Sequence, residues 1–130
     1  SIEDPFNQES WGDWANLNSK IGNKVWLVGD DLTVTNVKRI RQAKEQDCIN
    51  AVLIKPNQIG TVSETLDAVK LVKSYGWKTI VSHRSGETND SFIADLAFGV
   101  GADGLKAGSP LQSQRLVKYT RLIEIEKSLQ

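Results

Sequence analysis

The sequence predicts an α/β fold of five consecutive strand–helix units, as in part of a TIM-type parallel barrel. Five short apolar runs are each followed by a helical pattern, and their spacing of 23 to 28 residues suits one β–α–β repeat. In such a sheet all the carboxyl ends lie on one side, where active sites form. Eight units close a barrel, so five units make only an arc. The runs end at Glu3, Asp30, Lys55, His83 and Lys106.

The composition argues against several classes of function. Lys plus Arg and Asp plus Glu balance at 16 each among 130 residues, so no strongly basic surface for nucleic acid or anionic membranes is expected. No apolar run is long enough for a transmembrane segment, and no signal peptide is recognisable. The single cysteine, Cys48, cannot form an internal disulfide, which favours a reducing, cytoplasmic setting.

The organisation of the chain indicates one partial domain. Residues 1–130 contain no linker and no methionine. They begin two residues before Glu3, a carboxylate at the end of a predicted strand, where site residues are expected. We therefore expect residues 1–130 to be a single partial barrel domain and a piece of a longer polypeptide.

The first half of the chain alternates helical periodicity with apolar runs. The periodicity predicts a helix over 8–21 and a second helix that extends from the N-cap Asn36 to about Gln46. Strands are predicted over 25–29 and 51–54. The continuous apolar character of the second strand is typical of a strand covered on both faces.

The second half repeats this alternation. Thr61 and Glu64 form a capping-box pattern at the start of a helix. Strands are predicted over 78–82 and 103–106, and helices over 89–99 and 113–128. Val62, Leu66, Val69 and Val72 recur at helical spacing after this cap, and Phe92 and Leu96 are expected to face inward. One side of the last helix is marked by Leu116, Tyr119, Ile123 and Lys127.

Two carboxylates stand at the ends of neighbouring predicted strands. Glu3 and Asp30 offer the oxygen ligands that a hard cation such as Mg²⁺ prefers. The alternative is that these acids cap the next helix or pair with a lysine. The adjacent acids, Asp4 and Asp31, are expected to act as hydrogen-bonding groups around the two candidates.

Two lysines also end apolar runs. Lys55 emerges from the strand over 51–54, and a lysine shielded from water near other positive charge can serve as a base. The alternative is a lysine that extends from the strand end into solvent. The same two readings apply to Lys106, although Gly104 and Gly108 beside it favour close approach by a ligand.

The only histidine, His83, is followed by an anion-binding pattern. A lone histidine is more often structural than catalytic, but Arg84 binds phosphate groups well and Ser85 precedes a glycine in a possible anion-binding turn. No Walker loop, nucleophile elbow or dinucleotide-binding glycine pattern is present.

Taken together, five motifs resemble the enolase (phosphopyruvate hydratase) family, in family order and near-family spacing. The resemblance covers essentially the whole chain, and the run over 82–88 is highly specific. The motifs are SIEDPF at 1–6, GDDLTVTN at 29–36, KPNQIGT at 55–61, SHRSGET at 82–88 and LKAG at 105–108.

The resemblance implies a lyase of glycolysis that reversibly dehydrates 2-phosphoglycerate to phosphoenolpyruvate with two Mg²⁺ ions. It implies that Glu3 and Asp30 hold the first metal and that Glu3 also binds the substrate. Lys55 corresponds to the base that removes the C2 proton. The use of a Lys or His base with Mg²⁺ in enolase-type sites is a general property of such enzymes.

The remaining matched residues are implied to bind substrate. Arg84 and Ser85 correspond to a phosphate-binding pair, and Lys106 to a lysine that binds the substrate carboxylate. His83 corresponds to a histidine near the reacting centre, so that it joins Lys55 as a catalytic candidate.

The resemblance also implies groups that precede Ser1 in the family order. These are the N-terminal domain, the first barrel strands, a third metal carboxylate, a glutamate general acid and a mobile serine-bearing loop. The chain would therefore need the remainder of an enolase polypeptide as its partner and would be inactive alone, and the full-length protein is expected to be a homodimer. The alternative is a stand-alone, non-catalytic enolase fragment, such as a folding, complementation or engineered chain.

Overall fold

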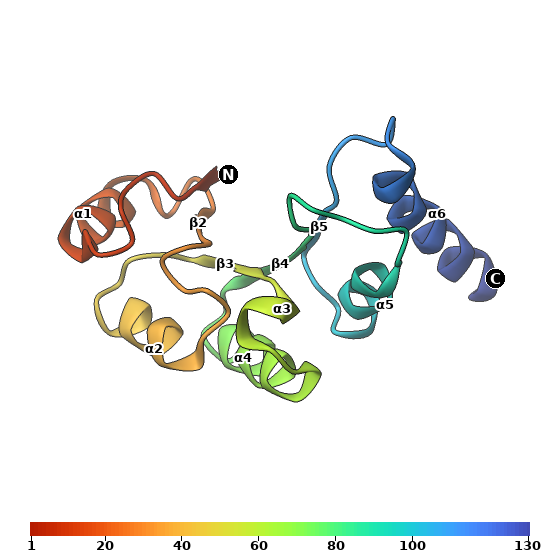
Figure 1. Ribbon diagram of the computed structural model, residues 1–130. Helices are drawn as coiled ribbons and strands as arrows, with labels where there is room; N and C mark the ends of the chain where they lie inside the picture. The colour runs from red at the N-terminus through yellow and green to blue at the C-terminus, as the bar shows by residue number, and fades with distance from the viewer. The chain divides into compact units, whose positions relative to one another are not determined.

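The computed structural model describes residues 1–130 and divides them into two compact units, a first unit of Ser1–Thr79 and a second unit of Ile80–Gln130. Five strands follow the chain order β1-β2-β3-β4-β5 in the sheet (Figure 1). The unit boundary falls within β4 (Lys78–Ser82). Each unit is described by itself below.

The first unit contains three parallel strands and the start of β4. The strands are β1 (Ile2–Glu3), β2 (Leu27–Gly29) and β3 (Ala51–Ile54), with Glu3 opposite Val28 and Val28 opposite Ala51. The helices of this unit are α1 (Trp11–Ile21), α2 (Val37–Glu45), α3 (Pro56–Ile59) and α4 (Val62–Ser74).

The second unit pairs two strands and two helices. β4 runs parallel to β5 (Gly104–Lys106), with Ser82 opposite Lys106. The helices are α5 (Phe92–Gly99) and α6 (Ser113–Ser128), which pack against each other. No helix in either unit combines the length and the apolar character needed to cross a membrane.

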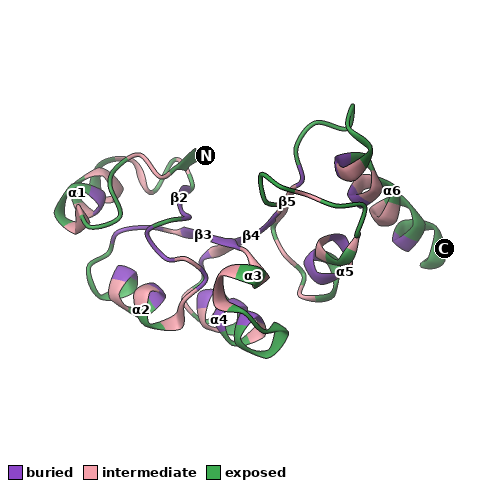
Figure 2. Cartoon of the chain, in the orientation of Figure 1, coloured by how far each residue is buried: buried purple, intermediate pink, exposed green.

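The core of the first unit forms around β3, which is buried along its whole length (Figure 2). Apolar side chains of the helices complete it, including the fully buried Trp14 of α1 and Ile40 of α2. Burying a side chain of this kind contributes roughly 1.5–3 kcal/mol relative to an exposed position. This core fixes β3 against its neighbours and so determines where the strand ends lie.

Most of the predicted elements are confirmed. The predicted bounds of β3, β4 and α6 agree with the structure. Asn36 caps α2 by accepting a hydrogen bond from the Lys38 N–H at 2.9 Å. Thr61 caps α4 by accepting from the Glu64 N–H at 3.2 Å, and its hydroxyl donates to the Glu64 carboxylate at 2.6 Å.

Several details of the prediction are wrong. The first helix begins at Trp11, because residues 7–10 form a turn in which the Ser10 N–H donates to the Asn7 carbonyl. The strands β2 and β5 begin later than expected, at Leu27 and Gly104. The short helix α3 was not predicted, because four residues carry no helical periodicity.

The buried faces of three helices differ from the apolar patterns in the sequence. Phe92, which was expected to face inward, is exposed, and so are Val62, Leu116 and Ile123 of the apolar patterns in α4 and α6. In α4 the buried residues are Thr65, Ala68, Val69 and Val72. In α6 they are Arg115, Lys118 and Ile125, so this helix buries two cations where an apolar stripe was expected.

One amide side chain ties the α1–β2 connection to the sheet. The Nδ2 group of Asn50 donates to the Gly22 and Val25 carbonyls at 2.6 and 2.9 Å, and its Oδ1 accepts from the Leu27 N–H at 2.8 Å. These three bonds satisfy backbone groups that the short β2 leaves without ladder partners. Asn50 therefore fixes the start of β2 at Leu27, and the strand ends two residues later at Gly29.

A buried thiol, that of Cys48, stands two positions before Asn50 in the sequence. Cys48 is fully buried, and its Sγ donates weakly to the Trp11 carbonyl. Burial, with a smaller effect of the Asp47 charge, raises the pKa of the Cys48 thiol to about 11. Because the thiolate is the reactive form, Cys48 is unreactive while the first unit is closed.

We predict that Asn50→Ala increases the rate at which a thiol reagent labels Cys48 by roughly 30-fold. Removing the amide leaves backbone groups unsatisfied at a cost of about 2 kcal/mol, and every 1.4 kcal/mol changes an opening equilibrium tenfold. Labelling is followed by mass spectrometry of the peptide that contains Cys48. Asn16→Ala, an exposed replacement in α1, is the control and should leave the rate within about twofold. Equal labelling rates in Asn50→Ala and Asn16→Ala would contradict the role given to Asn50.

Candidate functional site

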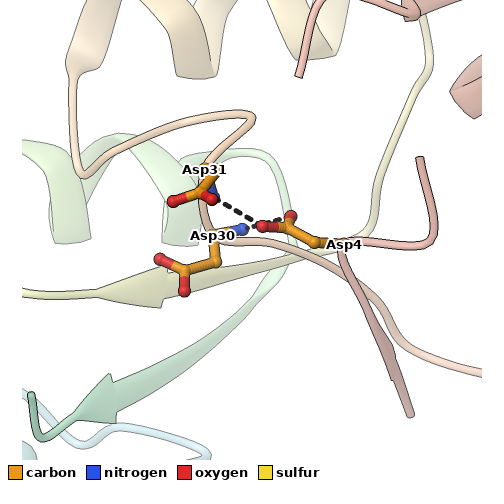
Figure 3. Close-up of side chains that lie close together, drawn as sticks. All are labelled: Asp4, Asp30 and Asp31. Carbon is orange, nitrogen blue, oxygen red and sulfur yellow. Dashed lines mark hydrogen bonds between the residues drawn. The ribbon is translucent and has the colours of Figure 1, made fainter. Parts of the chain in front are cut away.

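Asp4 braces the loop that follows β2. The residue has a left-handed backbone (φ 41°), and its carboxylate accepts hydrogen bonds from the N–H groups of Asp30 and Asp31 at 2.9 and 2.7 Å (Figure 3). Burial raises the pKa of the Asp4 carboxyl; the two backbone bonds lower it, and the Asp30 and Asp31 charges raise it further, so that the net direction is upward. The predicted hydrogen-bonding role of Asp4 is confirmed.

Asp30 uses its two carboxylate oxygens differently. Oδ2 forms an ion pair with Nζ of Lys55 at 2.5 Å, while the buried Oδ1 has no hydrogen-bond partner. Asp30 is only 8% exposed, so water does not solvate Oδ1 freely. An anionic oxygen in this state is costly unless a cation or a donor reaches it. The structure thus brings together two of the predicted site residues.

Lys55 is fixed at the end of β3 by its backbone as well. Its N–H donates to Oγ1 of the buried Thr35 at 2.9 Å. Thr35 and the preceding Val34 both have positive φ angles, 58° and 43°, which β-branched residues rarely adopt. Such conformations cost of order 1–3 kcal/mol each and persist only where the surroundings enforce them. This strained turn directs the Thr35 hydroxyl toward the Lys55 backbone.

The acidic groups near Asp30 can be compared as cation ligands. One carboxylate oxygen from each of Asp4, Asp30 and Asp31 lies within 4.8 Å of the others. Both oxygens of Asp4 already accept backbone hydrogen bonds and Asp31 is exposed, whereas the buried Oδ1 of Asp30 has no hydrogen-bond partner. Glu3 lies outside this group of three, at the exposed end of β1, and its metal-binding role stays a prediction.

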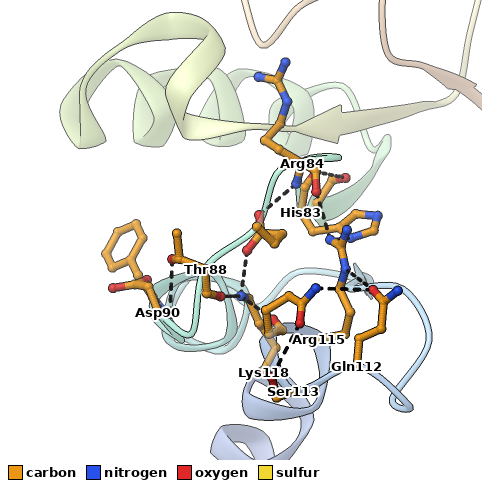
Figure 4. Close-up of polar contacts among 12 residues, drawn as sticks. His83, Arg84, Thr88, Asp90, Gln112, Ser113, Arg115 and Lys118 are labelled. Carbon is orange, nitrogen blue, oxygen red and sulfur yellow. Dashed lines mark hydrogen bonds and ion pairs between the residues drawn. The ribbon is translucent and has the colours of Figure 1, made fainter.

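The second unit brings the ends of β4 and β5 side by side. The His83 N–H donates to the Lys106 carbonyl at 2.8 Å, directly after the register pair of Ser82 and Lys106. Arg84 and Ser85 follow in an exposed loop. The Arg84 side chain points away from Arg115 in Figure 4. His83 and Lys106 are therefore adjacent in the backbone, as the prediction of a shared sheet edge requires.

Helix α6 holds the loop after β4 through two buried cations. Arg115 donates to the carbonyls of Arg84 and Ser85 at 2.8 and 3.0 Å. Lys118 donates to the Thr88 carbonyl at 2.7 Å and forms an ion pair with Glu87 at 2.6 Å. The loop backbone is thus fixed by bonds from α6, without using the Arg84 side chain.

Glu87 joins the start of this loop to helix α6. One carboxylate oxygen accepts from the Arg84 N–H at 2.8 Å, and the other pairs with Lys118. Burial raises the pKa of the Glu87 carboxyl, but the hydrogen bonds from Lys118 and the Arg84 backbone, with the charges of Lys118 and Arg115, outweigh it. The net result is a pKa below the ordinary value of 4.5.

Three residues that position the site were not predicted from the sequence, namely Thr35, Arg115 and Lys118. Arg115 and Lys118 stand three positions apart, and two cations at that spacing share one helix face. That spacing was the available signal, although exposed helices carry the same pattern. Thr35 precedes a helix cap and gives no distinct signal.

Comparison with known proteins places this chain within a large set of relatives. The sequence model of the C-terminal TIM barrel domain of enolase matches residues 1–130. The chain is 53% identical over 129 residues to "Enolase 2" of Hevea brasiliensis and to "Enolase" of Mycobacteroides abscessus, and 52% identical to "Enolase" of Solanum lycopersicum. Each match covers 99% of this chain but only 29–30% of the relative. The match confirms the predicted fold class, consecutive strand–helix units of a TIM-type barrel.

We predict that the loop after β4 loses protection as the pH falls below 4.5. A carboxyl whose pKa is lowered on folding stabilises the folded state above its unfolded pKa, and this stability is lost as the pH falls through the folded value. Hydrogen exchange of the 83–88 peptide, measured for wild type and Glu87→Gln at the same pH, isolates this effect because intrinsic rates cancel. The difference in protection between the two proteins should be largest at pH 6–7 and should shrink below about pH 4.5.

Glu126→Gln provides the matched control for this experiment, since Glu126 is an exposed glutamate of α6. It should leave exchange of the 83–88 peptide unchanged at every pH. A difference between wild type and Glu87→Gln that does not change with pH would refute the linkage to the Glu87 carboxyl.

Proposed function

We propose, because this chain belongs to the enolase family, that it carries the base side of a site for the reversible dehydration of 2-phosphoglycerate to phosphoenolpyruvate. The observation that carries the proposal is the buried Oδ1 of Asp30, which has no hydrogen-bond partner although Oδ2 is paired with Lys55 at the ends of β2 and β3. These are the positions that the family motifs assign to a metal ligand and to the base.

The metal-binding part of the proposal assigns Glu3 and Asp30 to the first of two Mg²⁺ ions. Asp30 fits this role because its Oδ1 is buried and has no hydrogen-bond partner. Asp4 supports the ligand indirectly by holding the Asp30 backbone at 2.9 Å. When bound, Mg²⁺ supplies electrostatic stabilisation of negative charge on the substrate.

We assign to Lys55 the removal of the C2 proton of the substrate. Its Nζ lies beside Asp30, and its backbone is held by Thr35, so the side chain has a fixed origin at the strand end. An ammonium has no lone pair, so Lys55 must first give up the proton that it holds in the ion pair and then accepts the C2 proton as the neutral amine. Such positioning matters because a catalytic base must lie within hydrogen-bonding reach of the proton that it removes. His83 is assigned to the surroundings of the reacting centre.

The remaining assignments concern the anionic groups of the substrate. Arg84 and Ser85 would bind the phosphate, and Lys106 the carboxylate. The support is that Arg115 fixes the loop backbone through the carbonyls of Arg84 and Ser85. A guanidinium on a rigid backbone is well suited to bidentate phosphate recognition.

The whole-protein activity requires more than this chain. The chain spans about 30% of the length of the curated relatives that it matches. We propose that the remainder of the polypeptide supplies the general acid and a third metal carboxylate, that these 130 residues alone are inactive, and that the complete protein is a cytoplasmic homodimer acting in glycolysis. The free, buried Cys48 is compatible with a reducing compartment.

We predict that Lys55→Ala in the complete polypeptide slows exchange of the C2 hydrogen of 2-phosphoglycerate by at least about a hundredfold, since general bases contribute 10²–10⁴-fold. Exchange in deuterated buffer is followed by proton NMR. Lys55→Arg should lose exchange to the same extent while it retains a cation beside Asp30, because arginine does not deprotonate in proteins. Lys70→Ala, at an exposed position in α4, is the control and should exchange normally. Normal exchange in Lys55→Arg would remove Lys55 as the base.

A further inference from the structure

Arg115 contacts the imidazole of His83 as well as the loop backbone. This arginine is 8% exposed and lies near the start of α6. Its Nη1 atom is in hydrogen-bond contact with Nδ1 of His83 and also donates to the Arg84 carbonyl at 2.8 Å. Nη2 donates to Ser85 and Nε to the Gln112 side chain, at 3.0 and 3.4 Å. All three guanidinium nitrogens therefore have acceptors.

The direction of the contact between Arg115 and His83 follows from the chemistry of the two groups. A guanidinium has only donors and stays protonated in proteins. Nδ1 of His83 must then be the acceptor, and an accepting ring nitrogen carries no proton. In the neutral imidazole the proton consequently resides on Nε2.

Gly108 provides a second, independent constraint on the His83 ring. A Cβ atom at this glycine would lie 3.0 Å from Cε1 and 3.3 Å from Nδ1 of His83, and 3.2 Å from Cδ of Arg115. The glycine has a φ of 83°, and its carbonyl accepts from the Tyr119 hydroxyl at 2.6 Å. The Gly108 backbone is thus held against the edge of the ring that carries Nδ1, so that this edge faces Arg115.

We propose that Arg115 is a positioning residue that sets the protonation of His83, with Nδ1 held as an acceptor and the proton held on Nε2. The Nε2 side of the ring then offers a donor, not a base, to a ligand at the ends of β4 and β5. Only this last step, toward a ligand, rests on the proposed function; the tautomer itself rests on the contacts of Arg115 and Gly108.

The replacement of Arg115 is a usable test because the loop keeps another attachment to α6. Lys118 retains its bonds to the Thr88 carbonyl and to Glu87, at 2.7 and 2.6 Å. Arg115→Met removes the donors at similar side-chain length, whereas Arg115→Lys retains a cationic donor. Arg121→Met is the matched control, since Arg121 lies on the same helix but pairs with Asp95.

The experiment is imidazole ¹⁵N NMR of the complete polypeptide labelled at histidine, without substrate or metal. His83 is the only histidine of this chain, and its signals are assigned by their loss in His83→Gln. In wild type at neutral pH we expect an unprotonated Nδ1 resonance and a protonated Nε2 resonance. Arg115→Lys and Arg121→Met should retain this pattern. In Arg115→Met, both resonances should shift toward each other as the second tautomer or the imidazolium becomes populated.

Two results would overturn the inference. One is a wild-type spectrum with the proton on Nδ1 or on both nitrogens, which needs no variant to interpret. The other is an unchanged His83 spectrum in folded Arg115→Met, which would show that Arg115 does not set the tautomer. Neither result bears on the C2 exchange of the Lys55 variants, so failure of this inference and failure of the proposed function are distinguishable.

Discussion

The divided use of the Asp30 carboxylate is the interaction on which the first unit's site depends. Oδ2 is neutralised by Lys55 at 2.5 Å, whereas Oδ1 is buried without a partner. A carboxylate that is buried with one oxygen unsatisfied is unfavourable by itself, and it becomes favourable when a cation binds there. Asp4 and Thr35 fix the backbones of Asp30 and Lys55. The strands β1, β2 and β3 are short, and these side-chain hydrogen bonds hold the backbone of the site residues just beyond the strand ends.

The second unit solves the same positioning problem with cations instead of carboxylates. Arg115 and Lys118 of α6 bind the carbonyls of the loop after β4, and Glu87 neutralises part of their charge. Buried charges are costly unless they are paired or hydrogen-bonded. Lys118 is paired with Glu87, and both cations donate to carbonyls of the loop. These bonds offset the cost of burying the two cations, and they also fix the backbone of the loop. In the first unit, Asp4 and Thr35 hold the backbones of Asp30 and Lys55 and themselves lie within the family motifs. In the second unit, Arg115 and Lys118 hold the loop and lie outside the motifs.

Sequence reasoning predicted the elements better than the faces that they bury. The bounds of β3 were predictable because Ala51–Ile54 is a continuous apolar run that ends before Pro56. The buried face of α6 was not, because periodicity assumes an apolar core, whereas α6 buries Arg115 and Lys118 for their hydrogen bonds. For the site, Asp30 and Lys55 were predicted to lie close together because each ends one of two neighbouring parallel strands. Contacts made by residues distant in sequence, such as that between Arg115 and His83, could not be predicted in this way.

Binding of Mg²⁺ to the complete polypeptide tests the role of Asp30 most directly. Calorimetric titration should give at least roughly a hundredfold weaker binding of the first ion in Asp30→Asn, since even the loss of groups that only orient a ligand costs 10–100-fold. Asp31→Asn is the matched control, because Asp31 contributes its backbone N–H to Asp4 and has an exposed side chain. It should bind the ion as wild type does. Wild-type affinity in Asp30→Asn, or an equal loss in Asp31→Asn, would contradict the assignment of Asp30 as the metal ligand.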